Sequence, residues 1–157
     1  MLALLLAFAI PTYGPIPQPR TTFAGLKVPT ADGEAVIANS GSTNTGGYVI
    51  RVYADGTVSV DQGVPIRKTI SKQLVTKFFD DLHAAGPLDA LPTAACMKSA
   101  SFGSSTRVGY HAQLSPDLSC PSTSSIGRAL TIDVNAIVNA AGVSMLPRSR
   151  SFQLQPQ

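Results

Sequence analysis

The chain has 157 residues, of which 44% are hydrophobic and 13% are charged, with 12 Pro, 2 Cys and no Trp. This length and apolar content predict one domain with a single hydrophobic core. The net charge is +3, but of the twelve Lys and Arg only Arg67 and Lys68 are adjacent. The basic stripe that is typical of nucleic-acid binding is therefore missing, and we expect no nucleic-acid partner.

The chain starts with an uncharged apolar run. Leu2 to Ile10 has the length of a signal-peptide core, and Ala7-Phe8-Ala9 matches a small-x-small cleavage box. No Lys or Arg precedes the run, so we interpret residues 1–10 as a truncated signal peptide of a secreted or periplasmic protein. The alternative is a buried strand or helix that Pro11 ends. A membrane span is not expected, because it needs about 20 apolar residues.

Three further segments follow from composition. Residues 11–32 carry five prolines and predict an extended, Pro-rich tether or a loosely docked arm. Residues 33–146 are expected to form the single folded domain. Residues 147–157, rich in Arg, Ser and Gln, predict a flexible tail.

The first strands are predicted within residues 34–60. Residues 34–39 form a short apolar run, and residues 40–47 form a Ser/Thr/Asn/Gly loop. Tyr48, Ile50, Val52 and Ala54 then alternate with more polar positions, and Asp55-Gly56 separates them from a second β-rich run, 57–60. Asp-Gly between two such runs predicts a hairpin with a type I′ turn. Residues 61–68 are expected to be a loop.

The clearest helix signal covers residues 71–85. Ser71 is a suitable N-cap, and Gly86-Pro87 provides a left-handed C-terminal residue followed by a helix breaker. The apolar positions recur at helical spacing: Leu74, Val75, Phe78, Phe79, Leu82 and Ala85. We expect this helix to pack on the hairpin.

The second half of the domain is less regular. Residues 106–114 alternate over their whole length and predict one half-exposed strand, with residues 97–102 as its hairpin partner. The Ser-rich residues 115–125 predict an exposed loop. Residues 130–141 fit a strand or a helix, and we favour a strand to about Ile132 followed by a short helix capped by Asp133. The expected fold is α+β: an antiparallel sheet of four to five strands with the main helix on one face.

Cys96 and Cys120 are the two cysteines. In an exported chain such a pair favours a disulfide, and the closed loop of about 25 residues would stabilise the protein by about 3 kcal/mol. Zinc needs about four ligands, and His83 and His111 are the other soft candidates, so we expect neither a metal site nor a cofactor. In a cytosolic protein the pair would be two ordinary thiols.

No catalytic motif is evident, and we lean towards a protein that is not an enzyme. Gly-x-Ser-x-Gly does not occur, and Ser104 in Phe102-Gly-Ser-Ser is best interpreted as a turn serine. Asp80 and Asp81 diverge by about 100° on a helix, so they do not converge on one substrate atom. Gly46-Gly47 precedes a strand and not a helix, which is the wrong context for a phosphate loop.

The best candidate binding residues are Arg107, His111 and Gln113. They share the polar face of the predicted strand 106–114 and would form a small cationic row. The alternative is an ordinary solvated strand face.

A resemblance supports the same picture. Tyr48-Val-Ile-Arg-Val-Tyr-Ala-Asp-Gly-Thr-Val58, the helix with Phe78-Phe79, and Leu114-Ser-Pro-Asp-Leu-Ser-Cys-Pro121 resemble uncharacterised exported bacterial proteins and a bacterial domain of unknown function. The resemblance covers about residues 48–121. It implies a hairpin, helix and strand core, and it transfers no catalytic residue.

We therefore expect an exported, noncatalytic binding or interaction domain, whose partner is a protein or a cell-envelope ligand. Two alternatives stay open. One is a secreted inhibitor of an extracellular enzyme, which would present residues 115–125. The other is a small hydrolase with His111 as general base.

Overall fold

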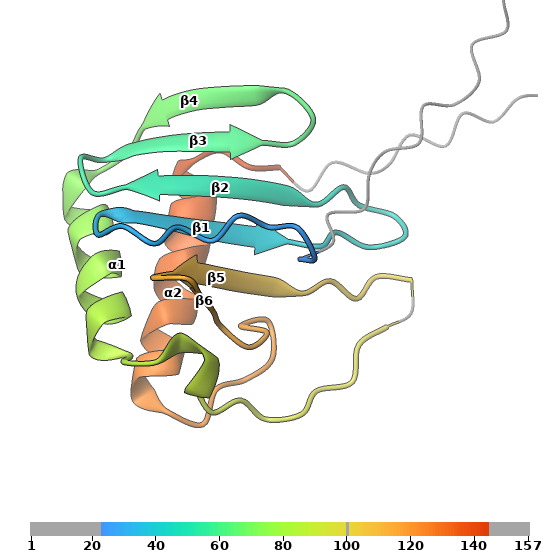
Figure 1. Cartoon of the computed structure of the whole chain (residues 1–157). Helices are drawn as coiled ribbons and strands as arrows, with labels where there is room; N and C mark the ends of the chain where they lie inside the picture. Colours follow the sequence, from blue (N-terminus) through green and yellow to red (C-terminus); the bar gives the residue numbers. More distant parts are fainter. Residues whose placement is uncertain (1–22, 100, 145–157) are drawn as a thin grey trace, which may run out of the picture.

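Antiparallel strands and two helices make up the computed structural model, which describes residues 23–99 and 101–144. The elements in chain order are β1 Glu34–Asn39, β2 Tyr48–Tyr53, β3 Thr57–Asp61, β4 Pro65–Thr69, α1 Lys72–Ala84, the 3₁₀ turn η1 Leu88–Ala90, β5 Thr106–Tyr110, β6 Gln113–Leu114 and α2 Ser125–Ala140. The sheet has the order β4-β3-β2-β1-β5-β6, and both helices cover one of its faces (Figure 1). The α+β prediction is confirmed, with six strands where four to five were expected.

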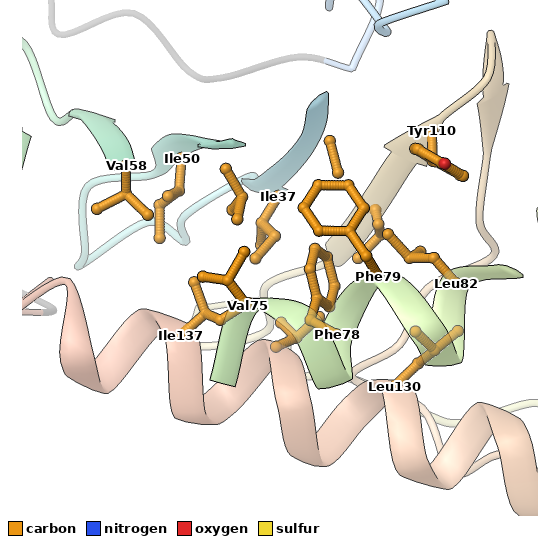
Figure 2. Packing of buried hydrophobic residues seen from close by; sticks show 14 of the residues in the cluster. Ile37, Ile50, Val58, Val75, Phe78, Phe79, Leu82, Tyr110, Leu130 and Ile137 are labelled. Atoms are coloured by element: carbon orange, nitrogen blue, oxygen red, sulfur yellow. The ribbon is translucent and has the colours of Figure 1, made fainter. Parts of the chain in front are cut away.

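The core lies between the sheet and the helices. Alternate residues of the central strands, such as Ile37 on β1 and Ile50 on β2, are fully buried there. They meet Val75, Phe78 and Phe79 of α1 (Figure 2). Among the described residues, no helix has the length and apolar character needed to cross a membrane.

The β2–β3 turn differs from the predicted type I′ turn. Gly56 N donates to Tyr53 O at 2.9 Å, and Gly56 has a φ of +94°. Asp55 is not left-handed, since His111 and Ala112 are the non-glycine residues with positive φ in the described part of the chain. The connection is thus a three-residue loop that ends in a left-handed glycine, a common alternative for Asp-Gly hairpins.

Residues 65–68, expected to belong to a loop, form the edge strand β4 together with Thr69. They pair with β3 in the register Val60↔Ile66. All five residues are exposed, so the strand carries no apolar alternation that sequence could show. Pro65 at its start is tolerated because an edge strand has no partner on one side.

The helix α1 matches its prediction closely. The Ser71 side chain accepts a hydrogen bond from Leu74 N, and Gly86 follows the helix with a φ of +65°. Val75, Phe78, Phe79 and Leu82 are buried.

The predicted division of residues 130–141 into a strand and a short helix is wrong. α2 is continuous over 16 residues and is capped by Ser124, whose side chain accepts from Gly127 N at 3.1 Å. Asp133 lies inside the helix, where its carboxylate accepts two hydrogen bonds from Lys77 Nζ at 2.8 and 2.9 Å. The helical stripe prevails over the strand alternation because Leu130, Val134 and Ile137 all reach the core.

The predicted single strand 106–114 is also wrong. The chain reverses at His111 and Ala112, whose φ angles are 48° and 60°, and β6 pairs back onto β5 with Tyr110↔Gln113. β1, and not residues 97–102, is the other neighbour of β5. Sequence did not reveal this tight turn because it contains neither Gly nor Asn.

Residues 23–32 cross the sheet on the face away from the helices (Figure 1). Gly109 makes this possible, since a Cβ there would lie 2.7 Å from Val36 Cγ1 and 2.9 Å from Val28 Cγ1. Pro29 O accepts a hydrogen bond from Ala112 N at 2.8 Å. The described part of the expected tether is therefore docked on the sheet. The expected signal peptide (1–10), the rest of the tether and the tail (147–157) lie outside the described residues.

Candidate functional site

The structure does not bring Arg107, His111 and Gln113 into one row. Arg107 is on β5 with its guanidinium 5.1 Å from the centre of the Phe23 ring, and its Nε is buried without a hydrogen-bond partner among the described residues. Gln113 Oε1 accepts from Leu88 N at 2.9 Å. The turn at His111 removes the common strand face on which the prediction depended. A binding role for the three residues stays a prediction.

His111 belongs instead to an aromatic cluster at the end of β5. Its ring stacks on Tyr110 with the centroids 3.8 Å apart, and its Nε2 lies 2.6 Å from Asp32 Oδ1. The Tyr110 hydroxyl is 3.2 Å from His83 Nε2, and the two histidine rings are 6.2 Å apart. Sequence reasoning did not find this cluster, because His83 and Asp32 are far from His111 along the chain.

The chemistry of this cluster is limited. Burial, together with the negative charge of Asp32, raises the pKa of Tyr110, so its hydroxyl is a poor nucleophile at neutral pH. In the ranges 23–99 and 101–144, no group of three or more His, Cys, Asp or Glu side chains is arranged to hold a metal ion. The cluster is best described as packing between the end of α1 and the β5–β6 turn.

The predicted disulfide is present. Cys96 and Cys120 are bonded, with their Cα atoms 5.5 Å apart. Two further contacts join the same segments: Ala94 N donates to Pro121 O at 2.9 Å, and Ser122 Oγ donates to Pro92 O at 2.8 Å. The chain before Cys96 is thus fixed along the segment that contains Cys120.

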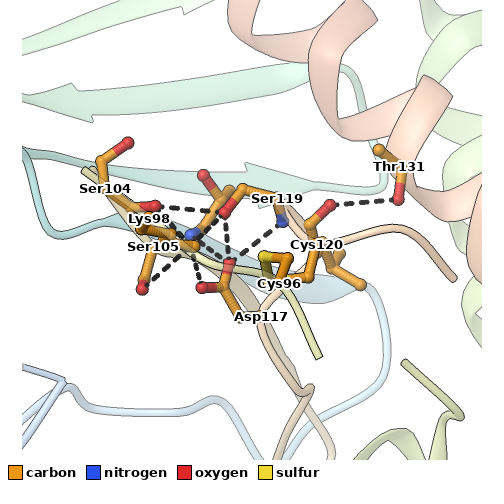
Figure 3. The surroundings of a disulfide bond; sticks show 10 residues. Cys96, Lys98, Ser104, Ser105, Asp117, Ser119, Cys120 and Thr131 are labelled. Atoms are coloured by element: carbon orange, nitrogen blue, oxygen red, sulfur yellow. Dashed lines mark hydrogen bonds and ion pairs between the residues drawn. A yellow bond between two sulfur atoms is a disulfide. The ribbon is translucent and has the colours of Figure 1, made fainter. Parts of the chain in front are cut away.

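Lys98 forms the centre of a polar network beside the disulfide (Figure 3). Its Nζ is paired with the Asp117 carboxylate and donates at 2.5 Å both to Ser104 O and to Ser119 Oγ. Thr106 N donates to the same carboxylate at 3.0 Å. The network therefore joins the loop after Cys96, the start of β5 and the segment before Cys120.

Asp117 keeps its negative charge at neutral pH. Burial by itself raises the pKa of Asp117, but hydrogen bonds from Lys98, Ser119, Ser105 and Thr106 outweigh it and hold that pKa well below its usual range. We interpret the network as structural. Sequence gave no signal for it beyond the nearby Cys96 and Cys120.

The segment 115–125 is not the exposed loop that its composition predicted. Ser115, Leu118 and Ser122 are buried, and Ser115 Oγ accepts from Val108 N at 2.9 Å. Gly127 on α2 allows this close packing, because a Cβ there would lie 2.1 Å from Ser122 Oγ. The two serines can be buried because their hydroxyl groups have partners, Val108 N for Ser115 and Pro92 O for Ser122.

Two surface hollows flank Ser119 and Cys120. The first, the loop hollow, has a volume of about 350 Å³ and is lined by Cys96, Met97, Lys98, Ser99, Phe102, Gly103, Ser104 and Ser119. Met97 is fully exposed and Phe102 is 71% exposed. The second, the α2 hollow, has a volume of about 370 Å³ and is lined by Leu118, Ser119, Cys120, Pro121, Ser122, Arg128, Thr131 and Ile132. The surface around the disulfide thus combines exposed apolar side chains with a firmly held backbone.

Comparison of the chain with protein-family models, with curated proteins and with solved structures found no match in any of the three. The resemblance of residues 48–121 to exported bacterial proteins therefore stays an expectation.

Proposed function

We propose that this protein is an exported, noncatalytic binding domain and that its binding surface surrounds the Cys96–Cys120 disulfide. The observation that supports this most directly concerns Met97 and Phe102. Both expose apolar side chains on a segment that the disulfide and Lys98 hold in place. An apolar side chain on a pre-ordered loop loses little conformational entropy on binding, which favours affinity.

The disulfide also supports the proposed location. Structural disulfides persist in secreted and periplasmic proteins and are rare in the cytosol. Intact mass of the protein recovered from a secreting host, alkylated with and without reductant, tests this. We expect alkylation of both cysteines only after reduction. Two freely alkylated thiols in the exported protein would contradict the proposal.

Binding is tested by selection from a random peptide display library on the immobilised, oxidised full chain. We expect the selected peptides to bind wild type at least about tenfold more tightly than the double variant Met97→Ser/Phe102→Ser, a loss of about 1.4 kcal/mol. The matched control is Val64→Ser/Ile66→Ser, which removes two other exposed apolar side chains far from the disulfide along the chain. Equal binding to all three proteins, or no selected peptide, would overturn the proposal.

A second candidate function is a secreted inhibitor of an extracellular enzyme. Support comes from the same loop, of which residues 97–99 and 101–104 are described, since an exposed loop that is held in place suits an enzyme cleft, whereas residues 115–125 are partly buried. A panel of secreted peptidases assayed with wild type and with Met97→Ser/Phe102→Ser would test it. An inhibition constant that the double variant leaves unchanged would rule the loop out.

A further inference from the structure

The α2 hollow contains the one large apolar side chain that the helices of the described region expose. Ile132 is 65% exposed on α2 and faces the segment that carries Cys120. Pro121 lines the other side of the hollow, with the buried Leu118 beside it. A volume of about 370 Å³ is at the lower end of the range of small-molecule pockets and is ample for one large side chain of a peptide.

The walls of this hollow are held by hydrogen bonds. Thr131 Oγ1 donates to Gly127 O at 2.9 Å and lies 3.4 Å from Leu118 O, which links α2 to the opposite wall. Cys120 in the same wall is fixed by the disulfide (Figure 3). The hollow therefore exists before a partner arrives, which lowers the entropic cost of binding.

Arg128 provides the charge at this hollow. Its Nη1 donates to Thr123 O at 3.2 Å and to Ser122 O at 3.5 Å, which orients the guanidinium. No carboxylate of the described residues lies within ion-pair distance of it, and the first turn of α2 has no acidic residue. Asp117, in the neighbouring network, is paired with Lys98. A guanidinium with donors left over is well suited to a carboxylate.

We propose that the α2 hollow recognises a peptide segment in which a large apolar side chain is followed by Asp or Glu. The apolar side chain packs between Pro121 and Ile132, and the carboxylate pairs with Arg128. This inference rests on the proposed binding function and specifies the chemistry of the partner.

The test is an NMR titration of the ¹⁵N-labelled, oxidised full chain, which detects affinities as weak as about 1 mM. The probes are the peptides Gly-Ser-Phe-Glu-Gly-Ser and Gly-Ser-Phe-Gln-Gly-Ser. We expect the Glu peptide to shift the amide signals of Thr131, Ile132 and their neighbours, and to bind about tenfold more tightly than the Gln peptide.

Two variants and a control separate the two contacts. Arg128→Gln should reduce the affinity for the Glu peptide about tenfold and leave that for the Gln peptide unchanged, whereas Ile132→Ser should weaken both. Asn139→Ser, at an exposed position of α2 outside the hollow, should change neither. Absence of binding would overturn the inference, and so would an Arg128→Gln variant that loses affinity for both peptides equally. Concentration-dependent dimerisation that Ile132→Ser abolishes would assign the hollow to a second copy of the chain and would also overturn it.

These outcomes are distinguishable from failure of the proposed function. One result would support the proposed binding function and contradict only this inference. It is that library-selected peptides need Met97 and Phe102 for binding but do not need Arg128 or Ile132.

Discussion

Lys98 and Asp117 form an ion pair beside the disulfide, although 19 positions separate them in the sequence. Lys98 Nζ also binds Ser104 O and Ser119 Oγ. The pair therefore holds together both segments that the disulfide joins.

Replacing Asp117 by Asn should lower the free energy of unfolding by about 2 kcal/mol at pH 7, because the Lys98 ammonium loses the carboxylate that it is paired with. The pKa of Asp117 is lowered in the folded state, so its contribution is complete above the unfolded value of about 3.9 and is lost as the pH falls below it. Urea unfolding of both proteins from pH 7 to pH 2.5 should show the difference shrinking below about pH 4. Asp89→Asn, at an exposed position, is the control; a difference that is constant with pH would contradict the assignment.

Replacing both cysteines by Ser should lower the free energy of unfolding by about 3 kcal/mol. The reason is that the disulfide, with a sequence separation of 24, restricts the entropy of the unfolded chain. Urea unfolding of this variant should coincide with that of reduced wild type. A variant as stable as the oxidised protein would show that the Lys98 network alone holds the loop.

Gly127→Ala should destabilise the protein by about 1–3 kcal/mol, although Ala favours helices by about 1 kcal/mol over Gly. The new Cβ would lie 2.1 Å from Ser122 Oγ and would push the Cys120 segment away from α2. Adding Ser122→Gly should restore part of the loss in thermal unfolding. An increase in stability on Gly127→Ala alone would mean that the two segments separate without cost.

Ala112→Gly should raise the free energy of unfolding by about 0.5–1 kcal/mol, because Ala112 has a φ of 60° in the β5–β6 turn and Gly adopts such angles without strain. Ala112→Val should lower it, since β-branched residues fit this region worst. Chemical denaturation of the three proteins should show that the free energy of unfolding decreases in the order Gly, Ala, Val. The reverse order would contradict the left-handed conformation of the turn.

Sequence determined those elements whose signals are local. Ser71 and Gly86 delimit α1, and the spacing of Val75, Phe78 and Leu82 fixes the face that it buries. The alternation in β2 and β3 and the pairing of Cys96 with Cys120 were likewise predictable, because periodicity and cysteine count do not depend on the rest of the fold.

Tertiary structure decided the rest. The alternation of residues 106–114 continues across the turn at His111, so only the pairing of β6 with β5 reveals that Arg107, His111 and Gln113 do not form a row. The helical state of Ile132 and Asp133 follows from core packing by Leu130 and Val134. The surface around Cys120 also includes Lys98, Phe102 and Arg128, which come from segments that are distant in sequence. These side chains lie near one another only in the folded chain, so sequence could not predict the surface.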